Sequence, residues 1–124
     1  MWETEGLGPM LGQNYHFNRY AHEDVSCAIK CYSEETPRLY VVLNRRLVDR
    51  DYNANSFSIA VYPCVNRYEW HRIDIDRFPE VKRCYQATGE RADVVRAYDE
   101  EKTIDLGNVT SDESRKVLLG VTMQ

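Results

Sequence analysis

The sequence predicts an α+β domain, a mainly antiparallel β-sheet or small sandwich with one short helix. Three observations support this class: several segments alternate apolar and polar residues, turn-forming residues separate them, and one segment has helical spacing. The chain has 124 residues, of which 43% are hydrophobic, enough for one core. We expect a flexible N-terminal arm over residues 1–14 and a single globular domain over residues 15–124.

The first two predicted strands cover residues 25–33 and 38–48 and form a hairpin. In the first strand every second residue is apolar, the period of a half-buried strand. Pro37 closes a short polar stretch that favours a turn. Two further strands are predicted over residues 57–65 and 68–77, with Pro63 indicating an edge or a bulge.

The period then changes from two residues to that of a helix. Pro79 suits the first helical turn, and Gly89 suits a C-terminal stop. Apolar and small residues follow at the spacing i, i+3, i+4, i+7, which predicts a helix over residues 79–88. A second hairpin follows, with strands at 92–98 and 102–106. The tail fits either a helix capped by Ser111 or Asp112 or a closing strand at 117–121, and we favour the strand.

The net charge of the chain does not indicate a class of binding partner. The 20 acidic and 16 basic residues give a net charge of -4, without the basic excess of a typical nucleic-acid-binding domain. No apolar run is long enough to span a bilayer, and the N-terminus lacks the pattern of a secretory signal. We therefore expect a cytoplasmic protein with reduced cysteines.

The histidines and cysteines raise hypotheses of catalysis and of metal binding. The three histidines are His16, His22 and His71. His22 and His71 could cleave RNA by general acid–base chemistry if the fold brought them together, but no spacing requires this. On a strand, Cys27 and Cys31 are about 13 Å apart and cannot share a zinc ion. In a helix they would be neighbours. We predict no catalytic residue, no metal site and no cofactor.

Aromatic and basic residues cluster more clearly. One group lies at residues 15–20 and another at 67–72. On the predicted strand, Tyr68, Trp70 and Arg72 share one face, and such faces stack on bases or anchor protein interfaces. The predicted binding residues are Tyr68, Trp70, Arg72, Arg67 and Arg96.

These features predict a small non-enzymatic binding protein, such as a viral or phage accessory or inhibitor protein that binds a partner protein. Two alternatives stay open. One is a protein that binds or sequesters a nucleotide-like anionic ligand through arginine, tyrosine and tryptophan. The other is a small histidine-dependent nuclease or phosphodiesterase. A second copy of the chain is a further candidate partner, as in a homo-oligomer.

Overall fold

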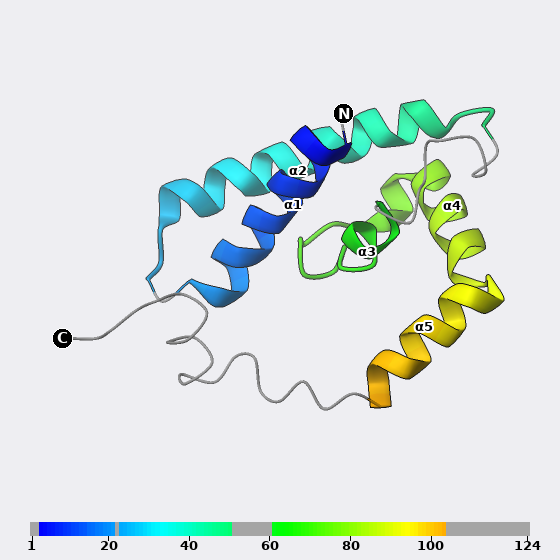
Figure 1. Ribbon diagram of the computed structural model, residues 1–124. Helices are drawn as coiled ribbons and strands as arrows, with labels where there is room; N and C mark the ends of the chain where they lie inside the picture. The colour runs from blue at the N-terminus through cyan, green and yellow to red at the C-terminus, as the bar shows by residue number, and fades with distance from the viewer. Residues whose placement is uncertain (1–2, 22, 51–60, 104–124) are drawn as a thin grey trace. The chain divides into compact units, whose positions relative to one another are not determined.

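The computed structural model describes residues 3–21, 23–50 and 61–103, and Figure 1 shows their arrangement. These residues form helices and turns, and no strand occurs among them. The prediction of a mainly antiparallel sheet was therefore wrong. The physical reason differs from one segment to the next.

The N-terminal segment is helical. The π-helix η1 (Glu3–Leu7), the α-helix α1 (Gly8–Tyr15) and the π-helix η2 (His16–Tyr20) follow one another without a break. Leu7 and His16, at the junctions, keep right-handed helical dihedral angles. Leu7 and Leu11 are buried, so residues expected in a flexible arm contribute to the core.

The long helix α2 (Ser26–Leu47) replaces the predicted hairpin at 25–48. The sheet-like alternation covers only its first turns, where Val25, Cys27 and Cys31 are exposed and not buried as expected. Further along, the buried residues follow the helical spacing i, i+3, i+4, i+7; they are Thr36, Leu39, Tyr40, Leu43 and Leu47. Pro37 lies inside this helix and not in a turn.

The two middle strands are also absent. The short helix α3 (Val61–Val65) occupies the end of the predicted 57–65 strand, whose first residues lie outside the described part. A series of turns covers residues 66–72, followed by the 3-10 helix η3 (Ile75–Arg77). Every second residue from His71 to Ile75 is buried, as the sequence predicted: His71, Ile73 and Ile75. The backbone there is irregular, however, and does not form a strand.

The helix predicted at 79–88 is confirmed as α4 (Pro79–Gly89), with Pro79 in its first turn. Helices α2 and α4 satisfy each other's end groups. The Asn44 side-chain oxygen accepts hydrogen bonds from the backbone N–H groups of Glu80 and Val81, at 2.9 and 3.2 Å. In return, the Arg83 guanidinium donates to the backbone carbonyls of Leu47 and Arg50, at 3.2 and 3.0 Å.

Contacts divide the chain into two units, residues 1–91 and 92–124. The second unit contains α5 (Ala92–Thr103), so a helix replaces most of the predicted second hairpin. The remainder of that hairpin and the strand at 117–121 lie outside the described residues. No described helix is long and apolar enough to cross a membrane.

In the first unit, α1 packs against α2, and α2 packs against α4. The core of this unit consists of aliphatic and aromatic side chains and one cysteine. It comprises Leu7, Leu11, Leu39, Tyr40, Leu43, Leu47, Val61, Tyr62, Val65, Ile73, Ile75, Phe78, Val81 and Cys84. Helices α1 and α3 meet at one side of this core, and the turns after α3 bring residues 67–71 to the same place.

Candidate functional site

Rings and guanidinium groups from two distant segments meet where the N-terminal helix contacts the turns after α3. We call this group the Tyr15–Trp70 cluster; it consists of Tyr15, Arg19, Tyr20, Arg67 and Trp70. The Tyr15 and Trp70 rings stack with centroids 5.0 Å apart and planes 13° apart. Tyr20 meets Tyr15 edge-on, and their hydroxyl oxygens are 2.9 Å apart.

Two arginines cover this stack. The guanidinium carbon of Arg19 is 4.6 Å from the Trp70 ring centroid, and that of Arg67 is 5.2 Å from the Tyr15 centroid. Both arginines are exposed, and Trp70 keeps 42% of its surface exposed. The cluster therefore exposes two guanidinium groups to solvent, and both lie over the stacked aromatic rings.

Burial and hydrogen bonding hold the Tyr15 phenol neutral. Burial is the larger cause, and together with the hydrogen bond to Tyr20 it raises the pKa of Tyr15 to about 12. The neighbouring cations Arg67 and Arg19 act in the opposite direction but more weakly. Tyr15 thus offers a neutral ring and hydroxyl rather than a phenolate.

A cavity of about 180 Å³ lies beside the cluster, which we call the α1 cavity. Helix α1 supplies one wall and α3 with its following turns supplies the other. Its lining residues are Gly8, Leu11, Gly12, Tyr15, Pro63, Cys64, Arg67 and His71. Apolar groups dominate the walls, with one thiol, one imidazole and one guanidinium among them.

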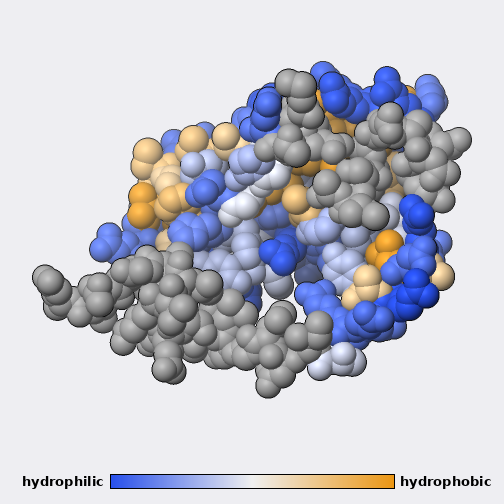
Figure 2. All heavy atoms as spheres, in the orientation of Figure 1, coloured by the Kyte–Doolittle hydropathy of each residue, from blue (hydrophilic) through white to orange (hydrophobic). Residues whose placement is uncertain are grey.

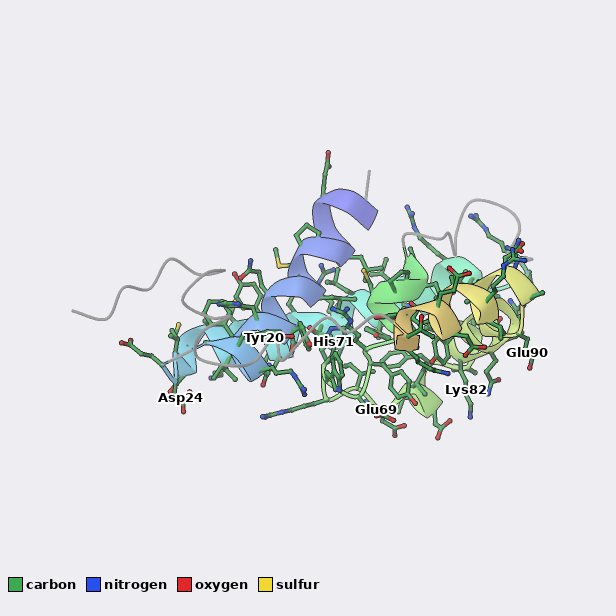
Figure 3. The ribbon with its side chains drawn as sticks, turned by 60° about the horizontal axis from the view of Figure 1, so that its bottom comes forward. Tyr20, Asp24, Glu69, His71, Lys82 and Glu90 are labelled. Carbon is green, nitrogen blue, oxygen red and sulfur yellow. The ribbon has the colours of Figure 1, made fainter. Side chains whose placement is uncertain are left out.

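His71 is 4% exposed and lies in the interior, whereas the neighbouring Glu69 projects to the outside (Figure 3). Burial is the main reason that the pKa of His71 falls to about 4, and the Arg67 charge lowers it further. A hydrogen bond to the backbone of Leu11 acts against this shift. The Nδ1 atom is buried and has no hydrogen-bond partner among the described residues. Neutral His71, one of the residues that line the cavity, therefore keeps an unpaired ring nitrogen in the interior.

The structure separates the binding residues predicted from the sequence. Arg67 and Trp70 enter the Tyr15–Trp70 cluster. Tyr68 instead meets Tyr85 edge-on, and Arg72 is exposed with a left-handed backbone φ of 58°. Arg96 belongs to α5 in the second unit, where it pairs with Asp93 at 2.7 Å. The predicted face of Tyr68, Trp70 and Arg72 does not exist, because these residues follow turns and not a strand.

The sequence shows an aromatic and basic group at residues 15–20, but no local pattern joins it to the group at 67–72. The contributions of Gly12, Cys64 and His71 to one cavity were missed altogether. Only a helical pairing of α1 with α3 reveals them. His22, which was hypothesised to act with His71 in acid–base catalysis, lies outside the described residues.

No family model matches the chain. Over 94 residues the chain is 43% identical to the disulfide-bond oxidoreductase YfcG of Escherichia coli, covering 73% of the chain and 44% of YfcG. A 49-residue stretch is 35% identical to protein URE2 of Candida glabrata, covering 40% of the chain and 14% of that protein.

Solved structures agree with these sequence matches. Ure2p in complex with S-hexylglutathione and Ure2p in complex with glutathione each match 77% of the chain, with a TM-score of 0.66 and 26% identity. The chain has the fold of the matching half of Ure2p. The matches cover 50% and 48% of those Ure2p chains, so the chain spans about half the length of these relatives or less.

These matches overturn the functions predicted from the sequence. The relatives are a disulfide-bond oxidoreductase and a protein solved with glutathione compounds. None is a viral or phage inhibitor, a nucleotide-binding protein or a histidine-dependent nuclease. The predicted partners, another protein or a nucleotide-like anion, are wrong for the same reason. Composition misled here because aromatic and basic residues suit many ligands equally well.

Proposed function

We propose that this chain is the helical part of a glutathione-transferase-like protein that binds glutathione compounds during thiol–disulfide chemistry. The observation that carries the proposal is the 43% identity with YfcG over 94 residues. The structural match with Ure2p, solved with glutathione and with S-hexylglutathione, supports the same ligand class. The activity and substrates of the whole protein are part of this proposal.

The α1 cavity is suited to one part of such a ligand. Sites that enclose a whole drug-sized ligand measure about 300–1,000 Å³, whereas this cavity measures about 180 Å³. It therefore takes a substituent and not the whole tripeptide. Its walls include Leu11, Pro63 and the Tyr15 ring. An apolar group on the glutathione sulfur, such as a hexyl chain, fits these walls.

The exposed arginines of the Tyr15–Trp70 cluster are suited to bind the carboxylates of such a ligand. Glutathione carries two carboxylates, and guanidinium groups bind carboxylates through short, charge-assisted hydrogen bonds. Arg67 both lines the α1 cavity and lies over the Tyr15 ring. It can therefore hold a carboxylate at the cavity rim while the sulfur substituent enters the cavity.

We further propose a cytoplasmic location. Glutathione chemistry of this kind needs a compartment rich in reduced glutathione, and Cys27, Cys31 and Cys84 carry free thiols.

Tryptophan fluorescence tests the proposed site. The sequence holds two tryptophans, and one of them, Trp70, lies in the cluster. Titration with S-hexylglutathione should quench the emission in a saturable way. Arg67→Ala should weaken the apparent affinity at least about tenfold, because an ionic hydrogen bond contributes roughly 1.5–3 kcal/mol.

Arg72→Ala is the matched control. Arg72 lies in the same series of turns and has the same charge, but it does not line the cavity. We expect it to bind S-hexylglutathione as the unchanged protein does. Absence of saturable quenching, or equal losses in both arginine variants, would contradict the proposed site.

A further inference from the structure

Helix α2 begins with two exposed cysteines. Cys27 and Cys31 lie in its first two turns, four residues apart, and both are exposed. Figure 2 shows hydrophobic surface at this end of α2, where Val25 is 41% exposed. Figure 3 marks the same end by Asp24, which precedes the helix. The two thiols thus share one exposed face of one helix.

The helix keeps these thiols from forming a disulfide with each other. Side chains four residues apart on a helix have Cβ atoms about 5–6 Å apart. A disulfide requires about 3.5–4.5 Å between Cβ atoms. Closing the bond would distort the first turns of α2, which are regular: the Ile29 N–H donates to the Val25 carbonyl at 3.0 Å. Both thiols therefore stay available to an external ligand.

A soft, two-coordinate cation fits this spacing. Zinc prefers four ligands, and no group of three or more His, Cys, Asp or Glu side chains among the described residues could hold a metal ion. A linear two-thiolate ion needs only two. With metal–sulfur bonds of about 2.3 Å, taken from zinc thiolates as a scale, its sulfur atoms lie about 4.5 Å apart. Two cysteines at i, i+4 reach that separation without moving the backbone.

We propose that Cys27 and Cys31 form a two-thiolate binding site for a soft cation of the copper(I) type. Soft thiolate ligands select copper(I) over the harder divalent ions. On binding, both thiols lose their protons: one Cu⁺ and two protein thiols give one bis-thiolate copper anion and two H⁺. No electron is transferred. This site is separate from the α1 cavity and does not depend on the proposed glutathione function.

The test is an anaerobic titration of the reduced chain with copper(I), supplied as its coloured bicinchoninate complex. We expect the chain to withdraw one equivalent tightly. A variant that keeps two exposed thiols but separates them is the sharpest comparison. In the double variant Cys31→Ser/Glu34→Cys the thiols lie on the same side of α2 but seven residues apart, about 10.5 Å along the axis. Glu34 is exposed, so the change should leave the helix intact.

The double variant should bind copper(I) at least about tenfold more weakly, because the second thiolate no longer reaches the ion. Cys27→Ser alone should show a similar loss, and far-UV circular dichroism should show unchanged helicity in each protein. Equal affinity in the double variant would overturn the proposal. So would spontaneous loss of two hydrogens from Cys27 and Cys31, measured by intact mass, with the helix preserved.

Discussion

At the scale of single residues, His71 shows how burial decides the chemistry of a side chain. Its imidazole lies between α1 and the turns after α3, with 4% of its surface exposed. Burial and the nearby Arg67 charge lower its pKa to about 4, from an ordinary value of 6.5. The residue is therefore neutral near pH 7, and protonating it opposes folding.

Acid should destabilise the protein through this group. Between pH 6.5 and about 4, His71 is protonated in the unfolded chain but stays neutral in the folded chain. The free energy of unfolding therefore falls as the pH falls. The contribution is fully present above pH 6.5, and its loss approaches roughly 3 kcal/mol near pH 4. Urea unfolding of wild type and His71→Gln between pH 7 and 4 measures it, because glutamine cannot be protonated. Identical pH slopes in the two proteins would contradict this assignment.

The sequence identified the residue types of the site but not their partners. Arg67 and Trp70 were predicted as binding residues, and the aromatic and basic character of residues 15–20 was noted. Their stacking could not be predicted, because 52 to 55 residues separate Tyr15 from Arg67 and Trp70 and the intervening chain was assigned to strands. Local periodicity carries no information about such a distant contact.

At the scale of the elements, α4 was predictable and α2 was not. Pro79, a regular helical spacing and Gly89 all favour the same short helix, and the structure confirms it. In the first turns of α2, apolar and polar residues alternate as they do in a strand. Pro37 follows a polar stretch, a pattern typical of a turn. The decisive signal is the set Thr36, Leu39, Tyr40, Leu43 and Leu47, whose spacing extends across the predicted turn. A window longer than the predicted strands is needed to detect it.

Two glycines in helices should respond in opposite ways to the same substitution. A Cβ atom at Gly12 in α1 meets nothing within 4 Å. Gly12→Ala should therefore raise the free energy of unfolding by about 0.5–1 kcal/mol, the usual helix preference for alanine. At Gly89, the last residue of α4, a Cβ atom would lie 2.9 Å from the Tyr62 hydroxyl oxygen. Gly89→Ala should lower stability, because the Tyr62 ring, stacked on Tyr85 with centroids 5.3 Å apart, must move.

Thermal unfolding of the two alanine variants beside wild type measures the contrast. A shift of a few degrees upward for Gly12→Ala and downward for Gly89→Ala is expected. If both variants shift in the same direction, the packing of α4 against Tyr62 is not as described.

At the scale of the whole molecule, the first unit is held together by mutual capping as well as by its core. Asn44 of α2 satisfies the start of α4, and Arg83 of α4 satisfies the end of α2. This arrangement fixes α2 and α4, while α1 packs on α2 and leaves a cavity against α3. Neither cap is visible in the sequence, because the partners are 33 to 37 residues apart.

The same architecture links the chain to its relatives. The helices match Ure2p structures over 77% of the chain, and the α1 cavity with its cationic rim belongs to this helical unit. The proposed function requires this unit to bind the sulfur substituent of a glutathione compound, and the chain by itself is sufficient to test it.

Binding of S-hexylglutathione to Gly12→Leu, with Gly12→Ala as the control, tests that requirement most directly. Gly12 lines the α1 cavity and has room for a side chain, so leucine should occupy the cavity without unfolding α1. Displacing two or more methylene groups of the hexyl chain, at about 0.8 kcal/mol each, should weaken binding at least tenfold. Gly12→Ala should bind nearly as wild type does. A Gly12→Leu protein that folds normally and binds S-hexylglutathione with unchanged affinity would contradict the account.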